Sequence, residues 1–159
     1  MQLTQFTDFA LRTLLYLAVH QDRLVPVAEV SAAYGISNHH LVKVAHQLAR
    51  LGYVESARGR GGGLRLARAP AKVTVGEVVR LTEPHFHVVE CFDRDHNTCP
   101  IVPACGLVRA LAQARERFLE VLDGLRLSDL VQDPARVDKL VKIWTRTGAA
   151  TRRQLASAE

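Results

Sequence analysis

The 159-residue sequence lacks any apolar run that approaches the roughly 18–20 residues needed to span a bilayer. Its first apolar stretch follows Asp8 and Arg12 and has no small-residue cleavage site behind it, so a signal peptide is not expected. No internal repeat is visible either. We therefore expect a cytoplasmic protein with reduced thiols, whose 48% hydrophobic residues can form a core without disulfides.

The sequence also lacks the patterns that common enzymes and nucleotide-binding proteins require. It has no visible Ser/His/Asp or paired-carboxylate arrangement, and its three cysteines lie in one segment without a second cysteine motif. Its glycine-rich segment, residues 59–63, matches neither GxGxxG between a strand and a helix nor GxxxxGK followed by Ser or Thr. We therefore expect no enzyme, and a cluster-bearing electron carrier would leave the basic hairpin described below without a role.

Acidic residues are scarce in the first half of the chain. Residues 1–80 contain ten Lys and Arg against five Asp and Glu, whereas residues 81–159 contain eleven of each. The whole formal surplus of +5 therefore lies in the first half. Such a localised surplus favours a polyanionic partner such as nucleic acid, and the alternative is a solvated basic surface.

Three amphipathic segments predict a helix-turn-helix. Residues 4–20 repeat apolar side chains at spacings of three and four, and two shorter helices are expected at Pro26–Gly35 and Ser37–Gly52. Short helices joined by a glycine-containing turn form a helix-turn-helix, and the second of the pair reads DNA. Residues 38–51 contain no Asp or Glu, which favours this reading over a generic amphipathic helix. The candidate DNA-contacting residues here are Ser37, Asn38, His39, His40, Lys43, Gln47 and Arg50.

Residues 53–68 predict a β-hairpin with a glycine-rich turn. Glycines let a backbone approach a surface closely, and arginines contact phosphates or enter the minor groove. The turn places Arg58 and Arg60 among its glycines. A basic hairpin after a helix-turn-helix is the wing of a winged helix, so Arg58, Arg60 and Gly61 are further DNA-contact candidates.

The remainder of the chain predicts more helices. Thr74 and Glu77 form a capping box for a helix that Pro84 ends. A long helix from about Ala104 to Asp123 repeats apolar residues at heptad spacing, which suits a seam between two subunits, with packing on the chain's own core as the alternative. The residues at this spacing are Leu107, Leu111, Ala114, Phe118, Val121 and Leu125.

The predicted fold is mostly α with a small β-hairpin wing. We divide it into a winged helix-turn-helix domain (1–83), a cluster-binding loop (84–106), and dimerisation and C-terminal helices (107–146). The last of these helices is expected from about Pro134 to Trp144. Residues 147–159 are small and polar, and we expect them to form a flexible tail.

All three cysteines, Cys91, Cys99 and Cys105, lie on one segment, residues 91–105, which we call the cysteine loop. Clustered thiols in a reducing compartment favour metal binding or redox chemistry. Structural zinc sites bring ligands in close pairs, whereas these gaps are wider and also suit an iron–sulfur cluster. Unliganded thiols are another alternative. Nearby histidines keep a zinc site of three cysteines and one histidine open: His85, His87 and His96.

Taken together, these features resemble the iron–sulfur winged-helix repressors of the Rrf2 type, and in particular their nitric-oxide-sensing members. The most specific parts are the start MQLTQFTDFALRTLLYLA, the RGRGGG turn and the PIVPAC end of the cysteine loop. The resemblance covers about residues 1–144, although the step from Cys91 to Cys99 is longer than it implies.

The resemblance implies a homodimer that binds double-stranded operator DNA and represses transcription. Each subunit would hold one 4Fe–4S or 2Fe–2S cluster through Cys91, Cys99 and Cys105. Nitric oxide would react with the iron and release the DNA. The alternatives are a winged-helix regulator with a zinc or redox-thiol loop, or an iron–sulfur status regulator.

The resemblance also implies candidates for a fourth ligand. In the related cluster-biogenesis regulators a histidine lies three residues after the third cysteine, but Val108 occupies that position here and cannot ligate. In the nitric-oxide-sensing members an acidic residue near the start of the first helix reaches over from the partner subunit, and Asp8 matches it. His96, His87 or an exogenous ligand are alternatives, and Asp8 can also pair with Arg12.

Overall fold

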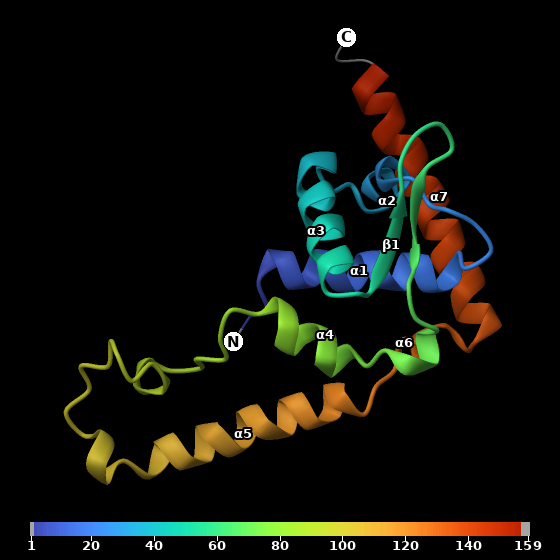
Figure 1. Cartoon of the computed structure of the whole chain (residues 1–159). Coiled ribbons are helices and arrows are strands. Elements are labelled where there is room, and N and C mark those ends of the chain that lie inside the picture. Colours follow the sequence, from blue (N-terminus) through green and yellow to red (C-terminus); the bar gives the residue numbers. More distant parts are fainter. Residues whose placement is uncertain (1, 157–159) are drawn as a thin grey trace.

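The computed structural model describes residues 2–156. Its helices and its antiparallel hairpin confirm the predicted fold, mostly α with a small wing (Figure 1). Within the described residues, no helix is long and apolar enough to cross a membrane. In chain order the main elements are α1 (Gln5–Val19), α2 (Val27–Tyr34), α3 (Asn38–Arg50), β1 (Val54–Ala57), β2 (Gly63–Leu66), α4 (Val75–Thr82), α5 (Gly106–Asp123), α6 (Leu127–Val131) and α7 (Pro134–Ala156).

Helices α1 to α3 form the predicted helix-turn-helix with its preceding helix. The Thr4 hydroxyl accepts a hydrogen bond from the Thr7 N–H and caps α1. Gly35 ends α2 in the left-handed conformation, φ 64°, which makes the turn to α3 possible. Ser37 precedes α3, but its side chain makes no capping hydrogen bond.

The wing consists of β1, β2 and the turn between them. The strands pair antiparallel, with Ala57 opposite Gly63 next to the turn. Gly59 and Gly61 have φ of 92° and 80°, so the turn needs glycine at both positions. Mutual backbone hydrogen bonds of 2.8 Å also join Leu64 of β2 to Val25, which fixes the base of the wing against the segment before α2.

Helix α7 packs along α1 and α2 and extends further than predicted. Trp144 is 5% exposed, and its ring centroid lies 4.6 Å from that of Tyr16. Beyond Trp144, Gly148 is buried at Ala32, and the Thr151 hydroxyl donates to the Ala32 carbonyl at 3.3 Å. The prediction of a flexible tail is therefore wrong for residues 147–156, because contacts with α2 hold them in the helix; residues 157–159 lie outside the described part.

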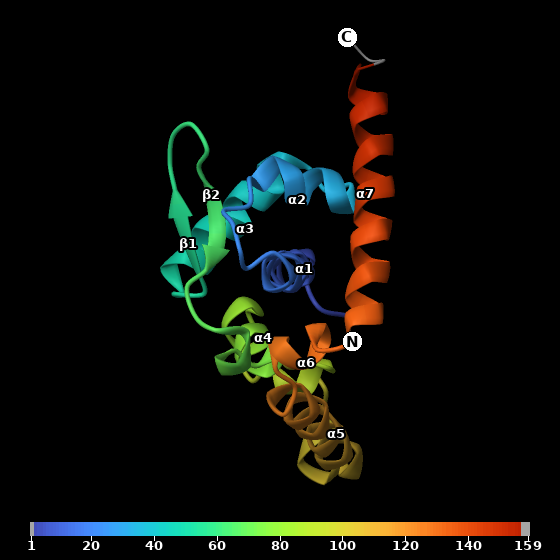
Figure 2. The same cartoon turned by 90° about the vertical axis from the view of Figure 1, so that its right-hand side faces the viewer.

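Helix α4 connects the winged helix-turn-helix to α5. Val79 of α4 and Leu119 of α5 are buried in a small core of their own. Figures 1 and 2 show α5 extending away from the body below α4, with the cysteine loop at its far end. The predicted capping box is half formed: the Thr74 hydroxyl accepts from the Glu77 N–H, whereas the Glu77 carboxylate pairs with Arg68.

The contact between α4 and α5 depends on a glycine. A Cβ at Gly76 would lie 2.5 Å from the backbone nitrogen of Asp123 and 2.7 Å from its Cα. We expect Gly76→Ala to lower the free energy of unfolding by about 1–3 kcal/mol, because the two helices must separate. Gly124→Ala is the control, since its added Cβ would meet its nearest neighbour at 3.6 Å. Equal melting temperatures for the two variants in thermal denaturation would contradict this close contact.

Candidate functional site

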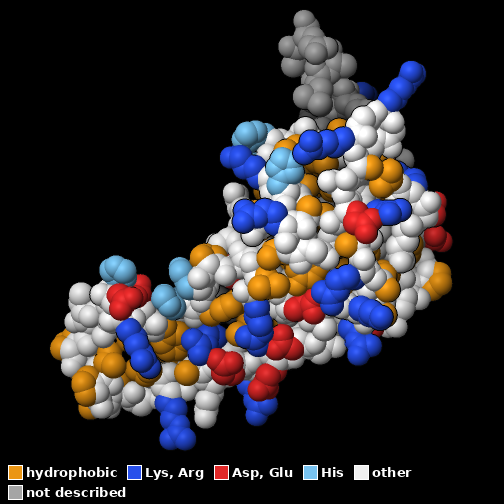
Figure 3. Space-filling view, viewed as in Figure 1, with side chains coloured by type: hydrophobic (Ala, Val, Ile, Leu, Met, Phe, Trp, Pro, Cys, Tyr) orange, Lys and Arg blue, Asp and Glu red, His pale blue; other side chains and the backbone are white. Residues whose placement is uncertain are grey.

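The predicted DNA-contact residues lie on the exposed side of α3 and on the wing turn. Figure 3 shows Lys, Arg and His side chains gathered over this upper part of the molecule. Gln47 is half-buried, and the His40 ring lies 6.3 Å from that of Phe9, on the side of α3 nearer α1. The exposed candidates are Ser37, Asn38, His39, His40, Lys43, Arg50, Arg58, Arg60 and Gly61.

Ion pairing divides the basic residues of this surface into two groups. Arg65 and Arg68, on and after β2, pair with Glu55 and Glu77, each at 2.7 Å. Among the described residues, by contrast, Arg58 and Arg60 on the wing turn have no acidic partner within ion-pair distance, and the same holds for two α3 candidates, Lys43 and Arg50. Their charges are therefore available to DNA phosphates.

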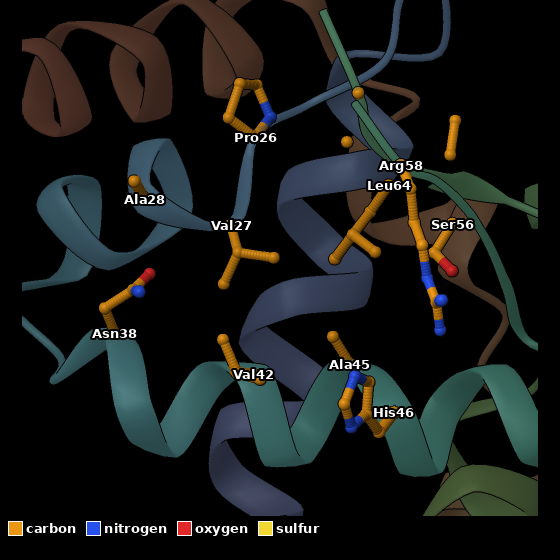
Figure 4. Close-up of a pocket in the computed structure, with 13 residues that line it drawn as sticks. Pro26, Val27, Ala28, Asn38, Val42, Ala45, His46, Ser56, Arg58 and Leu64 are labelled. Atoms are coloured by element: carbon orange, nitrogen blue, oxygen red, sulfur yellow. The ribbon is translucent and has the colours of Figure 1, made fainter. Parts of the chain in front are cut away.

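A groove of about 410 Å³ separates α3 from the wing and from the start of α2 (Figure 4). Val42 and Ala45 of α3 lie in it between Asn38 and His46, and Arg58 borders it from the wing. The prediction omitted His46 from the contact set. His46 follows Lys43 by three residues, and residues three apart on a helix share a face, so the pattern that predicts Lys43 as a contact also predicts His46.

The three predicted thiol ligands are free and half-buried. The structure places Cys91 in a single 3-10 turn (Glu90–Phe92) and Cys105 directly after another (Val102–Ala104). Among the described residues, no group of three or more Cys, His, Asp and Glu side chains converges to hold a metal ion. The thiols therefore share a loop but do not form a closed cage in this conformation.

Two hydrogen bonds close the long step between the first two cysteines. The N–H and the hydroxyl of Thr98 donate to Glu90 Oε1 at 2.7 and 2.6 Å, and they lower the pKa of this carboxyl group. Glu90 precedes Cys91 and Thr98 precedes Cys99, so this clamp draws the two cysteine positions together. The residues between Glu90 and Thr98 therefore form a loop that these two hydrogen bonds close at its base.

The histidines of this region are oriented toward a carboxylate. His96 Nδ1 lies 2.9 Å from Asp93 Oδ2, and His87 Nδ1 lies 3.8 Å from the same oxygen. The hydrogen bond with His96 is the largest cause that lowers the pKa of Asp93. His85 stacks on His87, with ring centroids 4.4 Å apart. The structure thus groups the histidines around Asp93, without adding one to the thiols.

The far end of α5 supports the cysteine loop. The guanidinium of Arg115 lies 4.9 Å from the centre of the Phe92 ring. A hollow of about 470 Å³ lies between loop and helix, and both Cys91 and Val108 line it. Position 108 therefore faces the region of the first thiol, and valine leaves it without a ligand atom.

Asp8, the predicted fourth ligand, pairs with Arg12 in this structure. Arg12 donates from Nε to Asp8 Oδ1 at 2.9 Å and from Nη2 to Oδ2 at 2.6 Å. The start of α1 is also tied to the approach of the cysteine loop, because the Thr4 N–H donates to Glu83 Oε1 at 2.8 Å. The role of Asp8 as a ligand stays a prediction, since it requires the partner subunit.

The donor set suits an iron–sulfur cluster by its chemistry. Three free cysteines on one loop can supply three thiolates, the ligands that such clusters prefer. The clamp between Glu90 and Thr98 already limits the distance between two of them.

Comparisons with known proteins agree on one family. The Rrf2 family, described as an iron-dependent transcriptional regulator, matches residues 3–133. The HTH-type transcriptional regulators NsrR of Geobacillus kaustophilus and Bacillus subtilis are each 46% identical to the chain, covering 89% and 90% of it and 97% and 99% of their own lengths. The structure of CymR, the global cysteine regulator of B. subtilis, is 23% identical and covers 83% of this chain and 97% of its own, with a TM-score of 0.66.

The match of the family over residues 3–133, most of the chain, establishes the class of the protein. Its members are regulators of transcription, which confirms the prediction that the protein is not an enzyme. The chain belongs to the Rrf2 family of iron-dependent transcriptional regulators.

Proposed function

We propose that the protein is a homodimeric transcriptional repressor that senses nitric oxide through an iron–sulfur cluster and then releases its operator DNA. The observation that carries this proposal is the cysteine loop: three free thiols on one segment, with the Glu90–Thr98 clamp linking the residues that precede Cys91 and Cys99. The family description as iron-dependent and the similarity to NsrR regulators support the same reading.

Cys91, Cys99 and Cys105 would hold the cluster, which supplies iron that reacts with nitric oxide. Asp8 of the partner subunit would be the fourth ligand. A carboxylate is a hard ligand beside three soft thiolates, so it would be the weakest attachment. The ion pair of Asp8 and Arg12 has side chains that are each 42% exposed, and such pairs contribute about 0.2–1 kcal/mol. Breaking the ion pair with Arg12 would therefore cost little free energy, and the pair could form again when the carboxylate leaves the cluster.

Helix α5 supports the proposed dimer. Leu107 is 61% exposed and Val121 is 71% exposed, whereas Phe118 and Leu125 pack partly against the core that α4 shares with α5. The predicted heptad row is thus divided between the chain's own core and solvent. A second copy of α5 would cover the exposed part, and a two-fold dimer would set the spacing of two α3 helices on the operator.

The architecture provides a route from the loop to the DNA surface. The cysteine loop connects α4 to α5, and α4 is the helix through which α5 packs on the body of the protein. Arg80 of α4 pairs with Asp123 of α5 at 2.7 Å across this contact. A change in how the loop is held would alter the angle of α5 and therefore the separation of the two winged helices in the dimer.

The first test measures the metal and sulfide content and the visible absorption of protein that is purified without oxygen. We expect a brown protein with visible absorption and with iron and sulfide bound. A colourless protein with bound zinc would contradict the proposal and favour the zinc alternative. Mössbauer spectroscopy of the same sample would distinguish a 4Fe–4S from a 2Fe–2S centre.

Asp8→Ala tests the fourth ligand. We expect it to change the visible spectrum of the bound cluster and the rate of the reaction with nitric oxide. Arg12→Ala is the matched control, because it removes the same ion pair but leaves the carboxylate. If Asp8→Ala matched the wild type in both measurements, Asp8 would not be a ligand.

A further inference from the structure

The C-terminal helix α7 carries a charge surplus of its own. Residues 134–156 contain six Lys and Arg and a single acid, Asp138. This segment lies beyond residues 3–133, which the family matches. The second half of the chain is balanced in charge only as a whole, because its C-terminal helix carries this basic surplus.

Four of the six Lys and Arg residues of α7 form a stripe along one face of the helix. At about 100° per residue, the four fall within roughly 60° of one another, opposite the face of Trp144 and Gly148 that packs on the body. All four are exposed, and among the described residues none has an acidic partner within ion-pair distance. We call these residues the α7 stripe: Lys139, Lys142, Arg146 and Arg153.

The second half of α7 packs on α2, and Figure 2 shows it at the opposite edge of the body from the wing. Gly148 and Thr151 contact Ala32 of α2, the first helix of the helix-turn-helix. Figures 1 and 2 both show the C-terminal end of α7 and the turn of the wing projecting toward the same end of the body, at the top of each view. DNA that leaves the operator at this end and bends toward the protein would pass along the outward face of α7.

We propose that the α7 stripe binds the phosphate backbone of double-stranded DNA that flanks the operator. The unpaired cations match a polyanion, and the winged helix already brings DNA to this end of the body. A membrane surface fits less well, because interfacial helices insert a continuous apolar face, whereas the large apolar side chains that α7 exposes are Val141 and Ile143 alone among the described residues. The inference rests on the DNA-binding part of the proposed function.

The test compares two duplexes carrying one operator selected from random DNA by the full-length, cluster-loaded dimer. The short duplex holds the operator, and the long one adds about two helical turns, roughly 20 bp, on each side. We expect the wild type to bind the long duplex about tenfold more tightly, and Arg146→Gln/Arg153→Gln to lose this gain. Four charges per dimer are removed, so the slope of log affinity against log salt on the long duplex should flatten by about 3–4.

Arg109→Gln/Arg117→Gln on α5 is the control, because it removes the same charge from exposed positions far from the wing and should keep the gain. If the α7 variant also kept it, the inference would be overturned. Stripe-dependent binding to vesicles of anionic phospholipid, without a change on the long duplex, would overturn it as well. Failure of the wild type to select any DNA would contradict the proposed function itself, whereas failure of the inference leaves binding to the short duplex intact.

Discussion

Replacing Cys99 with serine should yield a colourless protein without bound iron that no longer responds to nitric oxide. Cys99 is the middle thiol of the loop, and Thr98, which precedes it, is hydrogen-bonded to Glu90, which precedes Cys91. Serine is nearly isosteric with cysteine, but its hydroxyl is a poor ligand for iron at neutral pH. Two thiolates would then remain, too few to retain a cluster through purification. Iron and sulfide analysis with the visible spectrum measures this effect.

His96→Ala distinguishes the proposed iron–sulfur cluster from a zinc site of three cysteines and one histidine. His96 is exposed and pairs with Asp93, and its removal leaves all three thiols in place. We expect this variant to keep the iron, the sulfide and the visible spectrum of the wild type. Loss of the bound metal from both His96→Ala and Cys99→Ser would instead indicate a site of three cysteines and one histidine.

Removing the two arginines of the wing turn should weaken binding to DNA of every sequence. Arg58 and Arg60 are exposed and have no acidic partner among the described residues, so each can neutralise a phosphate. If each subunit makes about three or four phosphate contacts, the dimer's log affinity should fall with log salt at a slope of about −6. Arg58→Ala/Arg60→Ala removes up to four contacts per dimer, which should reduce the slope to about −3 and the affinity by roughly a hundredfold or more at low salt.

Arg65→Ala is the matched control for the wing. The Arg65 guanidinium pairs with Glu55 on the opposite strand at 2.7 Å. Because this ion pair already neutralises its charge, Arg65 should make no phosphate contact that its replacement could remove. We expect a much smaller change in slope than for the turn variant. A wild-type slope near zero, measured by fluorescence anisotropy over a salt series, would contradict the assignment of the wing to DNA.

Local patterns were sufficient to predict the DNA-binding half of the fold. The helix-turn-helix follows from short-range signals such as Gly35 after α2, and the wing from glycines that allow positive φ at 59 and 61. The length of α7 could not be predicted in this way. Its last turns depend on Ala32, more than a hundred residues away in sequence, and small polar residues such as Thr151 give no periodic signal of that contact.

The cysteine loop shows a similar division. Its thiols are evident from the sequence. The clamp between Glu90 and Thr98, which precede Cys91 and Cys99, is a side-chain contact that the spacing of the cysteines does not predict. The predicted seam on α5 was also incomplete, because the heptad pattern does not distinguish a partner from the chain's own α4. Phe118 faces that core, and Leu107 does not.

In the proposed function, the reaction of nitric oxide with a cluster held by the cysteine loop lowers the affinity of the dimer for its operator. The most direct measurement adds nitric oxide, without oxygen, to the cluster-loaded dimer bound to its selected operator and follows the fluorescence anisotropy of the DNA. We expect release of the DNA together with loss of the original cluster spectrum. Unaltered operator binding after the spectrum has changed would contradict it.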